Sequence, residues 1–227
     1  MASFRTTLQP SSPGMDSKGL QEELRKKADN ARELARAVAA NSVLPPALLQ
    51  EASSSEPAVK YKCIKVLRLV SEADQEMLYP HFAFFERLLD SPNSILKWNA
   101  IDIVANLAAA DSDNRFGTLF QKFYGLLDEG SLITAAHVID SSAKLAKARP
   151  ALEDRITREL LRVEEIPLPT EECRNILRGK VVSAFSQYFR QSRSSELMLS
   201  FAQRLMACPR PATRKKAEQF LKKFRGK

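Results

Sequence analysis

The chain has 227 residues and a formal net charge of +8, with only seven glycines and three cysteines. Phosphate-binding loops need clustered glycines, and neither GxGxxG nor GxxxxGK[ST] occurs, which argues against a nucleotide-binding α/β fold. The cysteines form no CxxC pair, so neither a zinc site nor a disulfide framework is indicated. No apolar run reaches the roughly 18 residues of a membrane span. We therefore expect a cytoplasmic protein without a cofactor, bound metal or membrane partner.

The first part of the chain divides into a polar leader and a helical cap. Residues 1–16 are rich in Ser, Thr and Pro, and we expect a disordered leader in which Met15 is an alternative start. Apolar residues at helical spacing then predict one helix from Ser17 to about residue 40, ended by Asn41. A short helix follows from Pro45 to Glu51. Residues 17–55 are thus predicted to form an N-terminal helical cap.

From Pro57 onward, helical periodicity and turn signals alternate regularly. Asp113, Ser131 and Thr170 precede helices and are predicted N-caps, because their side-chain oxygens can accept from free backbone N–H groups. The predicted A helices are 57–71, 94–109, 131–147 and 171–189; the predicted B helices are 76–89, 114–127, 151–164 and 195–206; a final helix covers 211–224.

The strongest pattern is an internal repeat of 37–38 residues. Lys97-Trp98 repeats Lys60-Tyr61, and Ile139-Asp140 repeats Ile101-Asp102. Phe85, Leu88, Leu89 and Asp90 likewise recur as Phe123, Leu126, Leu127 and Asp128. Helix pairs at this period predict an all-α solenoid, in which each pair buries its apolar surface against its neighbours. The phenylalanines of the B helices are predicted to be core.

The repeat resembles the HEAT/armadillo family, well over residues 57–165 and loosely over 166–224. The resemblance implies a right-handed α-α superhelix in a single solenoid domain, with the B helices on its concave side and a scaffold or adaptor function. Within it, 56–206 would form the HEAT-like repeats and 207–227 a basic C-terminal capping helix. The fourth repeat departs from the pattern, since its spacing shortens and its Ile-Asp pair is lost.

Candidate catalytic groups are few, and each has a structural interpretation. Asp102 and Asp140 occupy one repeat position on successive helices. Asn106 and Lys144, four residues further on, favour local pairing over a role in general acid–base catalysis. His137 lies near Ser141, but no glycine-lined oxyanion hole accompanies them. Trp98 occupies a repeat position, so core packing is favoured over a binding anchor. We predict no catalytic, cofactor or metal residues.

Positive charge is concentrated in residues 166–227, which hold 14 basic and four acidic side chains. Three interpretations remain open: a solvated end cap, a surface for an acidic protein, and a nucleic-acid surface. The predicted partner-binding residues are Lys122, Arg155, Arg158, Arg162, Arg204, Arg214, Lys215 and Lys222.

The sequence thus predicts a non-enzymatic protein-interaction scaffold of unknown oligomeric state. The alternative is a polyanion-binding protein that uses its basic C-terminal quarter. HEAT-like DNA glycosylases of alkylated bases are a further, less favoured alternative. Their catalytic Asp lies beside aromatic residues in a Trp-lined concave cleft. This chain has one Trp, and we expect no Asp to follow an aromatic residue on a concave-side helix.

Overall fold

The computed structural model describes residues 15–53 and 56–225, and all regular structure in these ranges is helical. The chain divides into two compact units, residues 1–73 and 74–227. The boundary follows the first helix of the predicted repeat array. In the described ranges, the helices are too short or too polar to cross a membrane.

The first unit contains four helices that share one core. They are α1 (Ser17–Arg25), α2 (Ala31–Ala39), α3 (Leu44–Ala52) and α4 (Pro57–Ala73). α4 packs against both α2 and α3, and fully buried leucines such as Leu20, Leu34 and Leu48 fill the space between the helices. Each helix presents one apolar face to this core, as amphipathic helices require for stability in water.

The prediction of one helix from Ser17 to residue 40 is wrong. The helix ends at Arg25, and Lys26 has an extended backbone. Two side chains stabilise the break: Lys62 donates to the Lys26 and Ala28 carbonyls, and Asn30 donates to Glu23 Oε2 at 3.0 Å. The two Lys62 bonds give carbonyl groups at the break a donor in place of the intrahelical N–H groups, and they depend on α4, which lies far along the sequence.

The predicted disordered leader, residues 1–16, is two residues too long at its C-terminal end. Residues 1–14 lie outside the described ranges, but Met15 and Asp16 belong to the first unit. Asp16 is the N-cap of α1, where its Oδ1 accepts from the Gly19 N–H at 2.7 Å. The Met15 carbonyl accepts from the Asn41 side chain at 3.0 Å.

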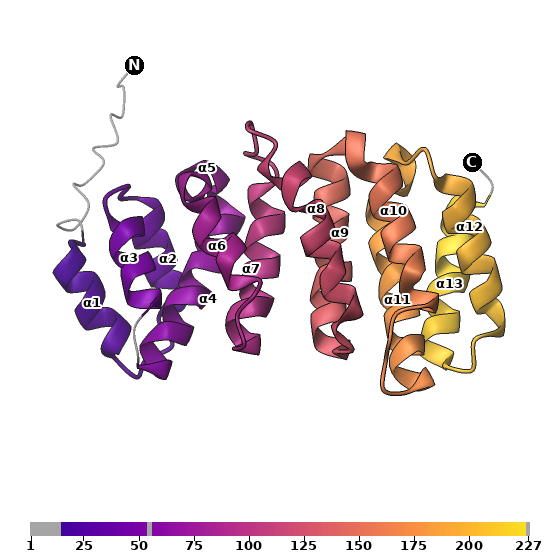
Figure 1. The fold of residues 1–227 in the computed structure, drawn as a ribbon, viewed down its shortest axis with the longest axis horizontal. Helices are drawn as coiled ribbons and strands as arrows, with labels where there is room; N and C mark the ends of the chain where they lie inside the picture. Colours follow the sequence, from indigo (N-terminus) through magenta and orange to yellow (C-terminus); the bar gives the residue numbers. More distant parts are fainter. Residues whose placement is uncertain (1–14, 54–55, 226–227) are drawn as a thin grey trace, which may run out of the picture. The chain divides into compact units, whose positions relative to one another are not determined.

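The second unit is a two-row stack of helices, as the repeat predicts (Figure 1). Short 3-10 segments extend several helices, and Pro80 lies in one of these segments, which interrupts the B helix predicted over 76–89. Its α-helices are α5 (Gln75–Leu78), α6 (Phe82–Leu88), α7 (Ser94–Leu107), α8 (Arg115–Gly125), α9 (Leu132–Ala148), α10 (Glu153–Leu161), α11 (Glu171–Tyr188), α12 (Ser195–Arg204) and α13 (Pro211–Phe224).

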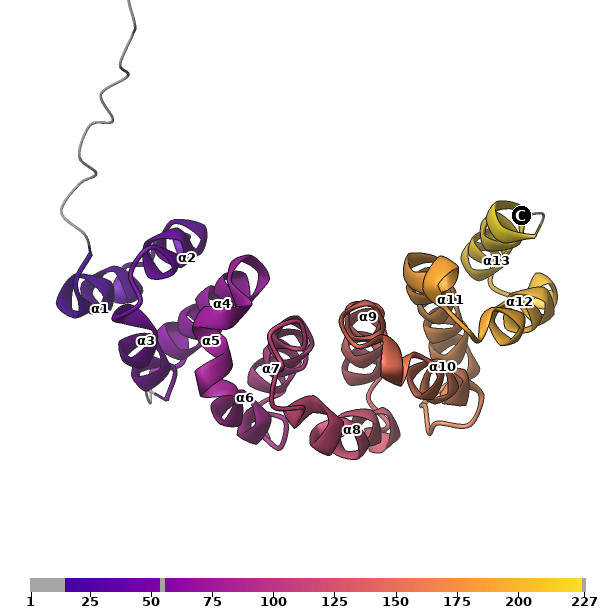
Figure 2. The same cartoon turned by 90° about the horizontal axis from the view of Figure 1, so that it is seen from above.

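Within the second unit, α7, α9, α11 and α13 form an inner row, and α6, α8, α10 and α12 an outer row (Figure 2). The expectation that the B helices line the concave side is therefore reversed. Buried aromatic residues such as Phe116, Phe120 and Phe123 fill α8 of the outer row, whereas each inner-row helix packs directly on the next, α7 on α9, α9 on α11 and α11 on α13. Interaxial distance follows side-chain size, so the stack bends toward the inner row.

The predicted helix caps are partly confirmed. Ser131 and Thr170 cap α9 and α11, accepting from the N–H groups of Thr134 and Cys173. Asp113 is not the cap of α8, so that prediction is wrong. The buried Asp111 carboxylate accepts instead from the N–H groups at the start of α8, at 2.8 and 3.0 Å, and from the Tyr79 hydroxyl at 2.7 Å. A tertiary contact thus selects the capping residue.

Candidate functional site

The inner row of the second unit exposes one stripe of side chains on each helix. We call these side chains together the inner face. Apart from the adjacent Trp98 and Asn99, neighbouring members of each stripe are three or four residues apart, which places them on one side of a helix. The inner face comprises Ile95, Trp98, Asn99 and Asp102 on α7, Ile133, His137, Asp140 and Lys144 on α9, Ile176, Lys180 and Ser183 on α11, and Lys216, Gln219 and Lys223 on α13.

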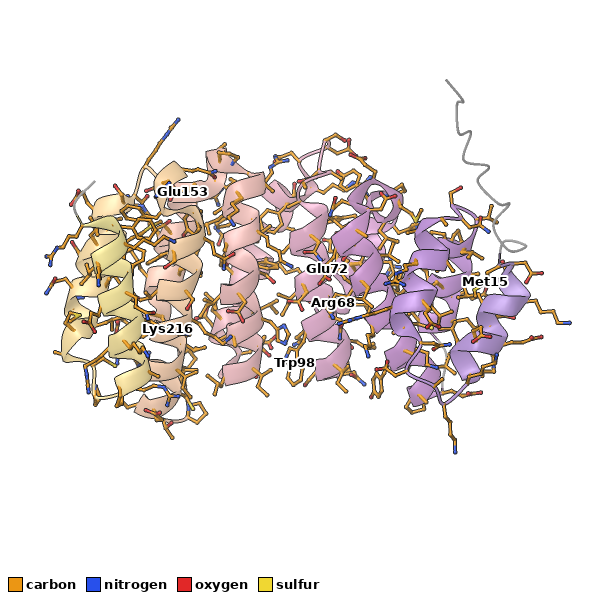
Figure 3. The ribbon with its side chains drawn as sticks, turned by 180° about the vertical axis from the view of Figure 1, so that it is seen from behind. Met15, Arg68, Glu72, Trp98, Glu153 and Lys216 are labelled. Atoms are coloured by element: carbon orange, nitrogen blue, oxygen red, sulfur yellow. The ribbon has the colours of Figure 1, made fainter. Side chains whose placement is uncertain are left out.

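A hydrogen-bonded cluster joins α7 to α9 on this face. The half-buried Trp98 ring stacks on His137, with centroids 5.7 Å apart, and its indole N–H donates to Thr134 Oγ1 at 3.1 Å. Asp102 Oδ1 lies 3.1 Å from His137 Nδ1 and accepts from Ser141 Oγ at the same distance. Figure 3 shows Trp98 on α7 in this row. The cluster pairs residues between helices, whereas the sequence predicted pairing within each helix.

The geometry of this cluster differs from that of a nucleophilic triad. A triad needs the serine hydroxyl on the histidine and the histidine on the carboxylate. Here Ser141 and His137 both contact the same oxygen of Asp102. Ser142, the other neighbouring serine, is buried and donates to the Val138 carbonyl at 2.7 Å. The arrangement fixes the two helices relative to each other and provides no relay from serine to histidine.

Trp98 and Asp102 do correct one expectation from the sequence. Asp102 follows an aromatic residue by one helical turn, and both residues lie on the inner row. The side chain of Asp102 is 22% exposed. The carboxylate therefore borders solvent one helical turn from an indole ring, and this is the arrangement that we expected to be missing.

Two isoleucines give the inner face an apolar component. Ile95 and Ile133 are 41% and 49% exposed and begin the stripes of α7 and α9. They are 38 residues apart, so they occupy the same repeat position. Exposed large apolar side chains beside a half-buried Trp98 provide surface that a partner can cover.

The inner face becomes more positive along the row, and α9 carries both Asp140 and Lys144. Asp102 on α7 and Asp140 on α9 are followed by Lys180 on α11 and Lys216 on α13. Lys180 pairs with Asp140 at 2.5 Å. Partial burial lowers the pKa of the Lys216 amine, and the neighbouring Lys180 cation lowers it further. The α13 end of the row is thus cationic and incompletely neutralised.

Four of the predicted binding residues lie on the outer row, where most are already paired. Lys122 on α8 contacts Asp90 at 2.6 Å, and Arg158 on α10 contacts Asp154 at 2.9 Å. Arg162 follows α10 and binds both Asp128 and Glu159, each at 2.8 Å, and these carboxylates raise its pKa. The Arg155 guanidinium lies 4.0 Å from the centre of the Phe120 ring. Lys122, Arg155 and Arg162 thus contact neighbouring helices, whereas the Arg158 pair is exposed and lies within α10.

The other four predicted residues lie on α12 and α13. Arg204 lies 5.7 Å from the Phe201 ring centre. Arg214 donates to the Cys208 and Pro209 carbonyls at 2.7 and 3.1 Å. Lys215 and Lys222 are exposed on α13. No single surface brings the eight predicted residues together, and their role in binding stays a prediction.

Ile133, Lys216 and Lys223 belong to the inner face but are not among the predicted partner-binding residues. The two lysines belong to the basic cluster of the sequence, and the apolar residues of α13 indicate which of its side chains are buried. The apolar pattern of α13 does not determine which of its exposed sides lies next to α11. The equivalence of Ile95 and Ile133 was visible in the repeat, but their exposure depends on which row is inner.

No protein-family model and no curated protein matches the sequence. Solved structures do resemble it. A designed armadillo repeat protein is 14% identical with a TM-score of 0.57, covering 91% of this chain and 99% of its own. A second designed armadillo repeat protein, in complex with the peptide (KR)4, is 15% identical with a TM-score of 0.58, covering 92% and 94%.

An engineered protein is 17% identical with a TM-score of 0.53, covering 91% of this chain and 90% of its own. These similarities confirm an all-helical, armadillo-like solenoid repeat fold for the chain. At such low identity they establish the fold alone, so function has to be argued from the inner face itself.

Proposed function

We propose that the chain is a non-enzymatic interaction scaffold whose inner face binds a segment of a partner protein. The observation that carries the proposal is the pair of exposed isoleucines, Ile95 and Ile133, at one repeat position beside Trp98. Apolar and aromatic side chains at regular intervals suit the side chains of an extended or helical peptide, because each can cover one anchor.

The fold supports this proposal. A similar designed armadillo repeat protein was solved with a peptide bound, so the same architecture can accept one. Solenoids also present long inner surfaces that are built from successive repeats, and these surfaces commonly serve for binding. The clusters on α7 and α9 hold the inner-face side chains in place, which reduces the entropy lost on binding.

A peptide-display selection on the full chain tests the proposal. Peptides that are enriched should bind the Ile133→Glu variant at least about tenfold more weakly, because a charge then replaces an apolar anchor. Gln121→Glu is the matched control, since Gln121 is exposed on α8 of the outer row and the charge change is identical. We expect less than about a twofold effect there. Enrichment of no peptide, or equal losses in both variants, would contradict the proposal.

A second candidate function has one observation in its favour. Some HEAT-like proteins are DNA glycosylases, and Trp98 with Asp102 places a carboxylate beside an aromatic ring on the inner row. Such a carboxylate could stabilise the positive charge that develops as an alkylated base leaves. Release of methylated bases from alkylated DNA tests this. Activity that Asp102→Asn abolishes and Asp140→Asn retains would establish the glycosylase; no release by the unaltered chain would exclude it.

A further inference from the structure

A groove runs between α11 and α13 at the C-terminal end of the inner row. It consists of two adjoining hollows of about 290 and 390 Å³, which share Ser186 and Lys223 in their linings. Lys216 and Gln219 line the first hollow, and Arg190 lines the second. Figure 3 shows Lys216 on α13 in the inner row. The groove belongs entirely to the second unit.

Cations and neutral donors line the groove. The charged lining residues are Lys216, Lys223 and Arg190, and no carboxylate lines either hollow among the described residues. These three cations also form no ion pair with a carboxylate in the described ranges. The groove therefore holds positive charge that the protein itself does not neutralise, and an anion is the complementary ligand.

The floor of the groove is rigid and aromatic. Phe220 and Phe224 are almost fully buried, and the Phe189 ring stacks on Phe224 with centroids 4.3 Å apart. The Lys223 amine lies 5.0 Å from the centre of the Phe224 ring. Because the Phe220 and Phe224 rings are almost fully covered by the protein, they support the groove from below, and its polar and charged side chains are left to contact a ligand.

Much of the remaining basic charge in this quarter is already engaged. Arg178 binds Glu164 and Glu171, Arg174 binds Glu171, and Arg210 binds Glu172. Inner-face cations without a carboxylate partner in the described ranges are therefore concentrated at the α11–α13 end, and Lys144 on α9, which donates to the neutral Asn106 side chain at 2.7 Å, is a further one. An anionic ligand that continued toward α9 would meet Asp140, whose side chain is 53% exposed.

These dimensions favour a peptide over a nucleic acid. Double-stranded DNA carries one charge about every 1.7 Å along its axis and needs a long cationic track. The hollows hold side-chain-sized groups, and the carboxylates of α7 and α9 would repel a longer polyanion. A short acidic segment can fill the groove and continue with apolar residues over Ile133.

We propose that the groove between α11 and α13 binds an acidic stretch, rich in Asp and Glu, of the partner protein. This inference rests on the proposed scaffold function and names the chemistry of its partner. Lys216, Lys223 and Arg190 bind the carboxylates, and Gln219 donates from its amide. The partner's sequence would then be acidic at one end of the bound segment and apolar at the other.

The test is a binding titration with defined probes on the full chain. Fluorescent (Asp-Glu)4 is the acidic probe, with (Lys-Arg)4, a Gly-Ser peptide of equal length and an oligothymidylate of equal charge as comparisons. We expect the acidic peptide to bind best at low salt, and the double variant Lys216→Glu, Lys223→Glu to weaken binding by at least about tenfold.

The matched control is Lys215→Glu with Lys222→Glu on the same helix. It changes net charge by the same amount, but neither residue lines the groove, so we expect less than about a threefold loss. All four lysines are exposed, and unchanged circular dichroism would verify the fold. Equal losses in both variants, or tighter binding of the oligothymidylate, would overturn the inference.

The display selection separates this inference from the proposed function. Selected peptides that bind the inner face but lack acidic residues would refute the acidic groove and leave the scaffold function standing. If no peptide of any composition binds, the scaffold function itself fails.

Discussion

The two ends of the inner row use their polar side chains differently. On α7 and α9, Asp102 contacts both His137 and Ser141 across the helix boundary, so polar groups stabilise the stack. On α11 and α13, Lys216 and Lys223 face a groove without a carboxylate in its described lining. In one fold, the polar groups that join α7 to α9 are thus paired within the protein, whereas the groove cations Lys216 and Lys223 have no carboxylate partner among the described residues. A partner that supplies carboxylates gains the most binding free energy at α11 and α13.

The repeat position of Asp102 shows how small the underlying sequence difference is. Asp140 occupies the same position 38 residues later, yet its side chain is 53% exposed and pairs with Lys180 instead of a histidine. The Asp102 side chain is 22% exposed. The role of the residue follows from what the next helix presents to it, so the repeat alone does not reveal the role.

The largest expected effect comes from removing the ring that joins α7 to α9. Trp98→Ala removes the stacking on His137 and the hydrogen bond to Thr134, and we expect a loss of about 2–3 kcal/mol in the free energy of unfolding. Urea unfolding would measure it. Ile95→Ala, on the same helix but 41% exposed, should change stability by less than about 1 kcal/mol. Similar values for the two variants would show that the cluster is not structural.

A smaller effect separates the two equivalent carboxylates. Asp102→Ala leaves Ser141 and His137 without their acceptor and should cost about 1–2 kcal/mol. Asp140→Ala removes an exposed ion pair and should cost no more than about 0.5 kcal/mol. Thermal or urea unfolding compares the two variants directly. If Asp140→Ala proved the more destabilising, the contrast between the two ends of the row would be wrong.

Asp140→Ala should also increase the affinity for an acidic peptide. Loss of the Asp140 carboxylate frees the Lys180 cation beside Lys216 and removes a negative charge from the path of the ligand. We expect the (Asp-Glu)4 peptide to bind about two- to threefold more tightly. Glu218→Ala is the control, because Glu218 is exposed on α13 but does not line the groove. Unaltered affinity in Asp140→Ala would place the peptide elsewhere.

The smallest expected effect is a change in the pH profile of binding. The pKa of Lys216 lies below the ordinary lysine value because of its partial burial, so its charge is lost at a lower pH than that of an ordinary lysine. Affinity for an acidic peptide should therefore fall earlier on the alkaline side than for an ordinary lysine. Lys216→Arg keeps its charge and should extend the plateau to higher pH. Lys223→Arg, the control, should leave the start of the fall unchanged.

Local sequence signals predicted the helices well. The final helix, α13, begins at Pro211 and ends at Phe224 as predicted, and Ser131 and Thr170 cap the helices assigned to them. These features depend on apolar periodicity and on residues within a few positions of the helix end. They are therefore readable from one sequence.

The features that were missed depend on contacts between distant residues. Lys62 of α4 stabilises the break after Arg25, and Tyr79 helps to hold Asp111 where it caps α8. Which row of helices is inner follows from side-chain sizes summed over several repeats. The predicted site on Lys122 and Arg155 rested on that choice of row, and both residues lie on the outer row.

The most direct test of the account is to locate a bound acidic peptide on the full chain by NMR. With backbone amides assigned, (Asp-Glu)4 should shift resonances of α11 and α13 around Ser183, Gln219 and Lys223, with little change on α8 and α10. Shifts concentrated on the outer row, or spread evenly over every exposed lysine, would contradict the claim that the inner face is the binding surface.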